Sequence, residues 1–289
     1  MTVSVLVPSS LVREAEDKRE ATRKLGYVAR AATVFRVDRL VVFPDDAGEN
    51  QFGGGFVETV LRYAATPPYL RKEAWGQRDE LEYAGVLPPL RVAPRTGSGS
   101  DESGSLRQGI VTEVGSEGRV RVNCGLQHPI SLVVPDGMEL GEGERVAIRV
   151  SSRRPVRAKI VDDPLPGYDV IASDLSTELS RDDAGVRIAT SRHGQPLSVG
   201  RLGDVVADTG ERGMTVAFGA PERGLPAILD IDVEAVPGGE TERESTVVSD
   251  EPDGTRFDLW LDAIPNQGSE VVRTEEALFA VLAPLSLTE

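Results

Sequence analysis

Residues 216–225, with the sequence VAFGAPERGL, decide the fold of this 289-residue chain. The apolar run at 216–218 predicts a buried strand that ends at Gly219, and a loop bounded by glycines follows it. In open α/β sheets, loops at the carboxyl ends of strands are the places where ligands bind. Backbone groups of this loop can read the edge of an adenine while the glycines admit its ring. The alternative is an ordinary turn between a strand and a helix.

Residues 261–278, LDAIPNQGSEVVRTEEAL, repeat this arrangement nearer the C-terminus. A strand is predicted to end in a Pro/Asn/Gly turn, after which a helix begins. Ser269 or Thr274 is expected to cap that helix, with support from Glu275 or Glu276. A capped helix start without a ligand is again the plain alternative.

Residues 24–32, KLGYVARAA, place a glycine and an arginine one turn apart on a predicted helix. Gly26 permits the close approach of another backbone, and Arg30 lies on the same helix face. Taken alone, an arginine on a helix is in most cases a solvated surface residue.

The flanking sequence predicts alternating strands and helices, which is the order of an α/β layer. Before residue 95 we expect strands at 3–8 and 40–43, a helix capped by Ser9 or Ser10, and a second helix at 53–65. After residue 167 we expect strands at 170–172, 185–189, 205–207, 215–218 and 257–263 and a last helix at 273–283. The acidic, turn-rich stretch 237–254 predicts a loop.

The middle of the chain has a different pattern. Residues 96–105, TGSGSDESGS, contain no apolar side chain and are typical of a flexible linker. Five short β-type runs follow, at 109–114, 119–123, 130–134, 145–150 and 156–161. They favour an OB-like barrel, although an SH3-like barrel has a similar signature. We therefore expect a barrel at 105–162, inserted between the two parts, 1–95 and 167–289, of one α/β domain.

The composition is strongly acidic, with 32 Lys and Arg against 47 Asp and Glu and a formal net charge of −15. Only four of the basic residues are lysines. An acidic surface with few lysines and few aromatic residues resembles that of haloarchaeal proteins adapted to high salt. At molar salt the screening length is roughly 3 Å, so an acidic protein is not prevented from binding RNA. Such binding must rest on short-range contacts from arginines, on stacking and on shape.

Several classes of function are disfavoured by what the sequence lacks. Cys124 is the single cysteine and only His128 and His193 are histidines, so we expect neither an intrachain disulfide nor a metal site. The first strand is not followed by G-x-G-x-x-G, and the P-loop and G-x-S-x-G motifs do not occur. No apolar run of about 18 residues exists, so we expect a cytoplasmic protein without a membrane span. His193, in SRHG, is expected to lie in a turn.

Together the three segments resemble the motifs of the SPOUT methyltransferases. Residues 24–32 are similar to the N-x-G-x-x-x-R-x-A helix of that class, with Lys24 at the asparagine position. The other two segments resemble its G-x-E-x-x-G-[LI] and I-P-x-x-G cofactor loops. The resemblance is closer to the archaeal and eukaryotic RNA uridine-N3 methyltransferases that carry an inserted OB-like domain, and it covers nearly the whole chain. Residues 61–72, 189–194 and 265–270 connect the chain with this branch.

This resemblance implies a knotted α/β domain, S-adenosylmethionine held in a bent form by the knot, and a homodimer whose active site is completed across the interface. The chain near 264–278 is then threaded through an earlier loop. No metal and no membrane are implied. The residues that the resemblance assigns to the cofactor are Thr190, Phe218, Gly219, Glu222, Gly224, Leu225, Ile264, Pro265, Asn266, Gly268, Val271 and Thr274.

The activity that follows is methylation of RNA, with N3 of a uridine in ribosomal RNA as the expected target. Arg30 and Arg71 are candidates to stabilise negative charge on the uracil oxygens, and Glu222 is the candidate proton acceptor. For Glu222, a structural role towards Arg223 or a backbone amide is the alternative. Ribose 2′-O-methylation, disfavoured by Lys24, and a non-catalytic RNA-binding assembly factor are the other two functions that remain open.

Overall fold

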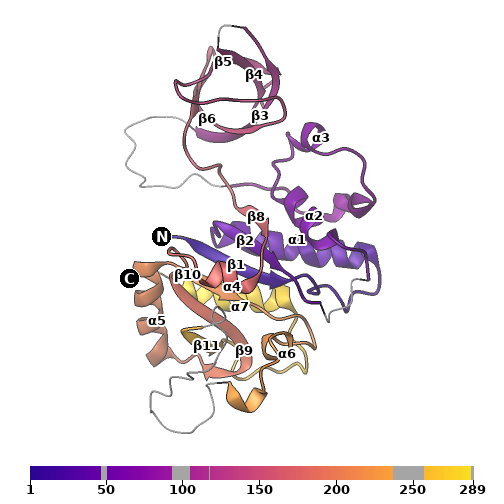
Figure 1. Ribbon diagram of the computed structural model, residues 1–289, viewed down its shortest axis with the longest axis vertical. Coiled ribbons are helices and arrows are strands. Elements are labelled where there is room, and N and C mark those ends of the chain that lie inside the picture. The colour runs from indigo at the N-terminus through magenta and orange to yellow at the C-terminus, as the bar shows by residue number, and fades with distance from the viewer. Residues whose placement is uncertain (47–50, 93–104, 117, 237–256, 288–289) are drawn as a thin grey trace. The chain divides into compact units, whose positions relative to one another are not determined.

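The computed structural model describes residues 1–46, 51–92, 105–116, 118–236 and 257–287. These residues form two compact units (Figure 1). The first consists of residues 1–62, 80–88 and 168–289, and the second of residues 63–79 and 89–167. The predicted loop at 237–254 and all but the last residue of the predicted linker at 96–105 lie outside the described residues.

The first unit is built on a parallel sheet of six strands in the order β11-β9-β10-β1-β2-β8. Every neighbouring pair is parallel, so the carboxyl ends of all six strands lie at one edge of the sheet. The strands are β1 (Val3–Pro8), β2 (Arg39–Phe43), β8 (Asp169–Ala172), β9 (Val186–Pro196), β10 (Met214–Ala217) and β11 (Leu259–Asp262).

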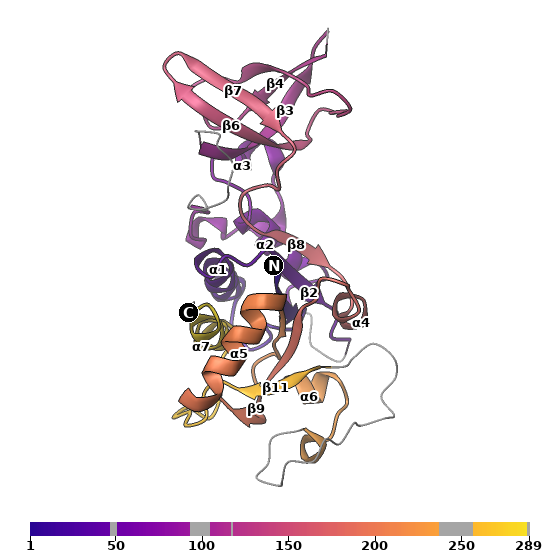
Figure 2. The same ribbon diagram turned by 90° about the vertical axis from the view of Figure 1, so that its left-hand side faces the viewer.

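Helices cover both faces of this sheet. Figures 1 and 2 show α1 (Lys18–Val34), α5 (Val199–Arg212) and α7 (Thr274–Leu285) together on one face, while α4 (Leu175–Leu179) and α6 (Leu225–Ile228) lie on the other. A helix α2 (Phe56–Ala64) follows β2. Strand β1 lies in the middle of the sheet. It pairs with β2 on one side, with β8 beyond it, and with β10 on the other side, with β9 and β11 beyond it. The strand order therefore reverses between β1 and β10, and such a switch point is where open α/β sheets bind ligands.

Two sequence-based expectations, one helix cap and one strand, differ from the structure. The predicted cap by Ser9 or Ser10 is wrong, because α1 begins only at Lys18 and the side chain of Asp17 accepts the hydrogen bond from the Glu20 amide, over 2.6 Å. The predicted strand at 205–207 is also wrong, since these residues lie inside α5. Val205, Val206 and Ala207 favour a strand locally, but Ser198 caps the helix and Gly213 ends it at a φ of 80°.

Strand β9 is longer than expected and contains His193, so the predicted turn at this histidine is wrong. Gly194 explains why the strand continues here. A Cβ at this position would lie only 2.7 Å from the carbonyl carbon of Trp260 in β11. The glycine thus lets β11 approach β9 where the register of the pair shifts.

The second unit contains the five strands expected in the middle of the chain. They form one antiparallel sheet in the order β5-β4-β3-β6-β7, in which the end strands β5 and β7 approach one another. The strands are β3 (Ser105–Val114), β4 (Arg119–Asn123), β5 (Ile130–Val133), β6 (Arg145–Arg153) and β7 (Val156–Val161). Their inward side chains enclose a core of Val122, Ile148 and neighbouring aliphatic residues. Residues 63–79, with the short helix α3 (Arg71–Ala74), belong to the same unit.

Candidate active site

The loop after β10 is a tight, hydrogen-bonded turn. The Ala220 amide donates to the Arg223 carbonyl over 3.0 Å, and the Arg223 amide donates back to Ala220 over 3.2 Å. Glu222, at the tip, is exposed and has a φ of 60°. This left-handed conformation is unfavourable for a residue with a side chain. The loop therefore carries strain at the position of its only carboxylate.

Packing around this loop explains one glycine but not the other. A Cβ at Gly219 would lie 2.5 Å from the amide nitrogen of Leu225, so the close turn excludes every other residue there. A Cβ at Gly224 would meet nothing closer than Pro226, at 3.6 Å. Phe218 and Leu225 are both buried and anchor the two ends of the loop. The open space at Gly224 leaves its backbone accessible to a flat ligand.

The loop after β11 is also held by its own hydrogen bonds. The carboxylate of Asp262 accepts from the backbone amide of Ile264 over 2.9 Å. The backbone amide of Gln267 donates to the Ile264 carbonyl over 3.0 Å. The Gln267 side chain donates to the carbonyl of Ser269 over 2.8 Å. Nothing lies within 4 Å of the position of a Cβ at Gly268. The loop is thus preformed, with an exposed glycine in its middle.

Hydrogen bonds join these loops across the sheet edge. The hydroxyl of Thr274, a residue with only 2% exposure, donates to the carbonyl of Gly219 over 2.8 Å. On the neighbouring strand, the Thr190 hydroxyl donates to the Ala217 carbonyl over 2.9 Å. The structure therefore brings together the residues from 190, 218–225 and 264–274 that the sequence pointed to.

The predicted cap of the last helix is wrong in detail. Arg273 precedes the first helical residue, and its amide donates to the carboxylate of Glu276 over 2.9 Å. Ser269 instead bonds the Val271 carbonyl within the loop. Thr274 is the first residue of α7 and its hydroxyl is used on Gly219. The support by Glu276 was predicted, whereas the inter-loop bond could not be read from the sequence.

An ion pair at the switch point was not predicted. Arg223 donates from Nε to the carboxylate of Asp45, over 3.1 Å to the nearer oxygen, and Asp45 is almost fully buried. The Ser10 hydroxyl donates to the same carboxylate over 2.6 Å, while the Ser9 hydroxyl accepts from the Asp45 amide over 3.0 Å. Loops after β1, β2 and β10 are thereby tied together. The sequence signal was a Pro-Asp-Asp directly after a buried strand.

The helix with the glycine and arginine pattern is α1. Gly26 is buried, and a Cβ there would lie 3.0 Å from the Pro88 ring, so this glycine serves packing. Lys24 is also buried, with ion pairs to Glu14 at 2.7 Å and to Glu20 at 3.2 Å. Arg30 is exposed and has no hydrogen bond or ion pair among the described residues. Lys24 therefore has a structural role, while Arg30 remains available for a ligand.

Arg71 lies in the second unit. Its Nε donates to the Thr66 carbonyl over 3.1 Å, and its guanidinium lies 4.6 Å from the centre of the Tyr63 ring. These local contacts give Arg71 a structural role within residues 63–79.

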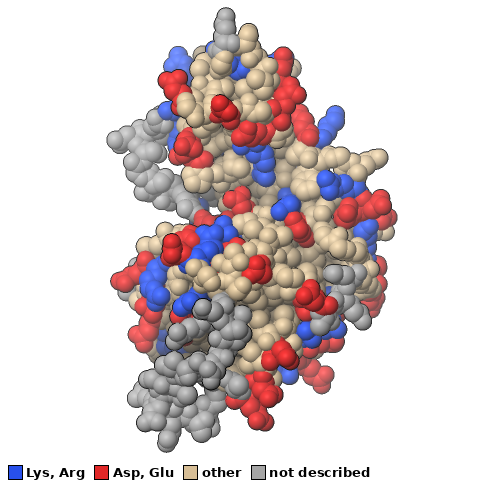
Figure 3. All heavy atoms as spheres, viewed as in Figure 1, with Lys and Arg blue, Asp and Glu red and all other residues tan. Residues whose placement is uncertain are grey.

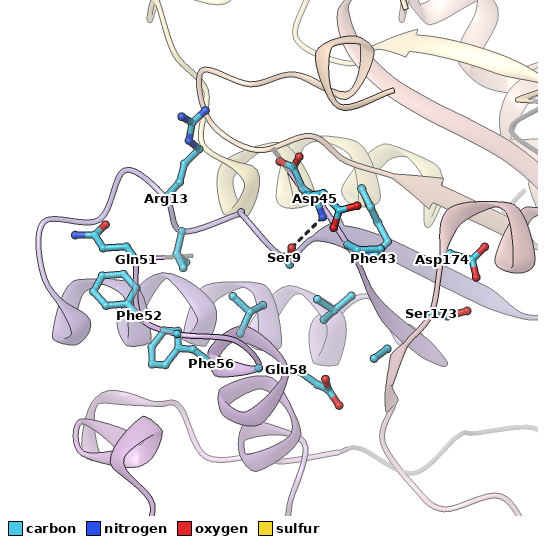
Figure 4. Close-up of a pocket in the computed structure, with 18 residues that line it drawn as sticks. Ser9, Arg13, Phe43, Asp45, Gln51, Phe52, Phe56, Glu58, Ser173 and Asp174 are labelled. Carbon is cyan, nitrogen blue, oxygen red and sulfur yellow. Dashed lines mark hydrogen bonds between the residues drawn. The ribbon is translucent and has the colours of Figure 1, made fainter. Parts of the chain in front are cut away.

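A cavity of about 570 Å³ opens at the carboxyl ends of β1, β2 and β8 (Figure 4). This volume lies in the range of small-molecule sites. Its walls combine aromatic side chains with charged and polar ones, and Asp45 links it to Arg223 of the loop after β10. The principal residues that line it are Ser9, Arg13, Phe43, Asp45, Asp46, Gln51, Phe52, Phe56, Glu58 and Asp174.

Two titratable groups near the loop after β11 are perturbed by burial. Desolvation raises the pKa of Asp262 and lowers the pKa of His193. At the start of α7, burial also raises the pKa of Glu275, whose Oε2 is buried without a hydrogen-bond partner. Perturbed groups of this kind gather at functional sites.

Metal and membrane features do not appear in the described part of the chain. In that part, no group of three or more His, Cys, Asp or Glu side chains is arranged to hold a metal ion. None of its helices is both long enough and apolar enough to span a bilayer.

Comparisons with known proteins point to one family. Residues 2–285 match the family described as putative RNA methyltransferase. An uncharacterized protein of Haloarcula marismortui is 69% identical over 290 residues, and one of Halobacterium salinarum is 70% identical over 289 residues; both alignments cover all of each chain. The human 28S rRNA (uridine-N(3))-methyltransferase is 29% identical over 318 residues, covering 98% of this chain and 77% of the human protein.

Proposed function

Because the chain belongs to this family of RNA methyltransferases, we propose that it transfers a methyl group from S-adenosylmethionine to N3 of a uridine in ribosomal RNA. One observation carries the proposal: the two glycine-bearing loops after β10 and β11 lie together at the carboxyl edge of the sheet. The hydrogen bond from the Thr274 hydroxyl to the Gly219 carbonyl joins them. The name of the human relative supplies the class of target.

Two loops, together with Thr190 of β9, would hold the cofactor. Open space at Gly224 and Gly268 allows a flat adenine ring to approach the backbone, and these exposed glycines fit such a ligand. Phe218 and Leu225 anchor the ends of the loop after β10, while Thr190 of β9 bonds the last residue of β10 and Thr274 at the start of α7 bonds Gly219. The bound cofactor supplies an electrophilic methyl group with a neutral leaving group. The remaining members of the set are Gly219, Glu222, Ile264, Pro265, Asn266 and Val271.

The chain itself must position the uracil, exclude water and accept a proton. Methylation at N3 removes the N3 proton, and negative charge then develops on the uracil oxygens. Arg30, exposed and without a described partner, is the proposed donor to these oxygens, with Arg71 as the second. Glu222 is the proposed proton acceptor, because the strained turn holds its carboxylate at the exposed tip of the loop.

We further propose a trefoil knot in which residues 264–278 thread through an earlier loop of the chain. The order of the strands supports it: β11 lies outside β9, and the chain then returns to pair Thr274 with Gly219. Knots are rare in proteins. Because a threaded segment cannot leave its loop while the protein stays folded, the loops of such a site cannot separate.

A homodimer with a shared active site is the proposed assembly. Arg23, Tyr27, Arg30 and Val34 are all exposed and recur at helical spacing along α1. Tyr27 and Val34 keep 51% and 44% of their surface exposed, which suits a contact with a second copy. In such a dimer, Arg30 of one protomer would complete the site of its partner.

The five-stranded sheet, at 105–162, is proposed to be an inserted OB-like barrel that binds RNA. This segment has nine basic and seven acidic residues, whereas the chain has 32 and 47. Figure 3 shows acidic side chains spread over the visible face of the molecule. Against that background, a segment with a basic excess is the better surface for a polyanion.

Two measurements test the proposed function. Calorimetry in molar salt should detect S-adenosylmethionine binding with micromolar affinity. Mass spectrometry of ribosomal RNA nucleosides should then show that 3-methyluridine is lost on deletion of the gene and restored by the intact protein. Loss of a 2′-O-methylated nucleoside would indicate the ribose reaction. No heat at millimolar cofactor would instead favour the assembly factor.

A further inference from the structure

The cavity at the carboxyl ends of β1, β2 and β8 has no role in the cofactor site described above. We propose that it receives the unstacked uracil base that becomes methylated. This inference rests on the proposed function, because it names the place of the base in that reaction. Enzymes that act on a base must remove it from its stack and read it in a pocket.

The walls of the cavity fit a flat base. Phe52 and Phe56 lie side by side on one wall, with ring centres 5.2 Å apart and planes tilted by 45° (Figure 4). Phe56 is buried, whereas Phe52 is only partly buried. The buried ring therefore holds the other in place, and Phe52 can offer its face to a ligand. Stacking on an aromatic side chain is the general way in which proteins hold unstacked bases.

Two of the four carboxylates that line the cavity are paired with arginines. Asp45 is bound by Arg223 and by the Ser10 hydroxyl, and Glu58 forms an ion pair with Arg62 at 2.7 Å. Their charges are therefore balanced within the protein. The cavity does not present a cluster of free carboxylates of the kind that a cation requires.

Asp174 is held differently, by neutral hydrogen-bond donors at the start of α4. Its side chain accepts from the Thr177 amide over 3.0 Å and from the hydroxyls of Ser176 and Thr177. These hydrogen bonds lower the pKa of Asp174 to about 2. The side chains of Arg13 and Asp46 have no hydrogen bond or ion pair among the described residues. Arg13 therefore stands against the two carboxylates of Asp46 and Asp174, and this small negative charge disfavours an anion but not a neutral base. Arg13 can donate to the keto oxygens of such a base.

The position of the cavity favours a substrate of this reaction. It opens beside the switch point, and its wall residue Asp45 is bound to Arg223 of the loop at 219–225. A base in the cavity and a cofactor on that loop would therefore lie on the two sides of one ion pair. Proximity of this kind is what a methyl transfer between two bound molecules needs.

The test compares three variants in single-turnover methylation of ribosomal RNA from a deletion strain. Phe52→Leu removes the ring but keeps an apolar side chain, while Phe52→Tyr keeps the ring. Phe257→Leu is the matched control, because Phe257 belongs to another aromatic pair, with Trp260 at 5.5 Å, at the opposite end of the strands. We expect a loss of roughly 10- to 100-fold for Phe52→Leu. Phe52→Tyr and Phe257→Leu should stay within about threefold of the wild type.

Cofactor affinity and thermal unfolding of each variant separate a local loss from misfolding, and both should be unchanged in Phe52→Leu. A second measurement does not depend on turnover: RNA that contains 4-thiouridine is cross-linked to the wild-type protein, and labelled peptides are identified. Cross-links within 51–58 are expected. A Phe52→Leu rate near that of the wild type, or cross-links confined to other peptides, would overturn the base pocket. A wild-type protein that neither binds cofactor nor methylates RNA would instead overturn the proposed function.

Discussion

The hydroxyl of Thr274 donates to the carbonyl oxygen of Gly219 over 2.8 Å, although 55 residues separate them in the chain. Both residues border loops at the same edge of the sheet, and Thr274 is 2% exposed. A buried carbonyl that loses its donor stays unsatisfied, which is costly. This bond therefore fixes the distance between the two loops.

Thr274→Val should weaken both folding and cofactor binding. The isosteric side chain leaves the Gly219 carbonyl without its donor, so we expect a loss of about 1–2 kcal/mol in the free energy of unfolding. Affinity for S-adenosylmethionine should fall as well, because the loops can separate. Thr209→Val is the matched control, since this buried threonine bonds only within α5. Equal effects of the two changes on calorimetric affinity would contradict the role of the inter-loop bond.

Glu222→Gly should separate strain from chemistry. Glycine adopts a positive φ without penalty, so the variant should unfold with a free energy about 1 kcal/mol higher than that of the wild type. If the carboxylate accepts the N3 proton, methyl transfer should nevertheless fall by about 100-fold. Glu222→Gln keeps the strain and removes the charge, and it should lose activity without a gain in stability. Full activity in both variants would leave Glu222 with a purely structural role.

Arg30→Ala and Arg71→Ala should each reduce the single-turnover rate while cofactor affinity is kept. Loss of one charged hydrogen bond to a transition state corresponds to about 100- to 1000-fold in rate. The contacts of Arg71 with Thr66 and Tyr63 supply its competing structural role. Unfolding measurements show which role applies. Rates within about threefold of the wild type for both variants would refute the assignment.

Mixing two inactive variants tests whether the active site is shared between protomers. Equal amounts of Arg30→Ala and Glu222→Gln protein, exchanged between dimers, should recover about one quarter of the wild-type activity. The physical reason is that half of the mixed dimers are heterodimers, each with one intact site. Activity that stays at the level of the separate variants would place both residues in one protomer or rule out the dimer.

Glu275→Gln should stabilise the protein at neutral pH. Burial raises the pKa of Glu275 in the folded state, so ionisation opposes folding. The stabilising effect of the protonated form is present below the unfolded-state pKa of about 4.3 and is lost as the pH rises through the folded-state value. The variant should therefore gain stability over the wild type above this window and match it at lower pH. Urea unfolding across pH 4–8 measures the difference, and a constant difference would contradict it.

The strands were predictable where local pattern and tertiary context agree. Residues 119–123 and 156–161 alternate clearly and form β4 and β7 with the expected bounds. At 205–207 the β-branched residues favoured a strand, but the capping by Ser198 and the packing of α5 decided otherwise.

The candidate site was predictable in part. The glycine-bearing loops could be found because strand ends and turn residues are local signals. Asp45 could not be found as a partner of Arg223, because 178 residues separate them and a buried pair leaves no local pattern. Likewise, Ser9 and Ser10 resemble helix caps by type, and only the fold directs their hydroxyls to Asp45.

The central pairing of β1 with β10 has a consequence for synthesis of the chain. Val3 lies opposite Met214, so the sheet cannot close until about 210 further residues have left the ribosome. Each strand pair of the antiparallel sheet, in contrast, joins residues that are at most 45 positions apart. Contacts between distant residues form slowly, because the closure of long loops costs entropy. During translation the small β unit can therefore form while β1 has only β2 beside it. The edge of β1 that later pairs with β10 is then unpaired and apolar, and it is open to misassociation.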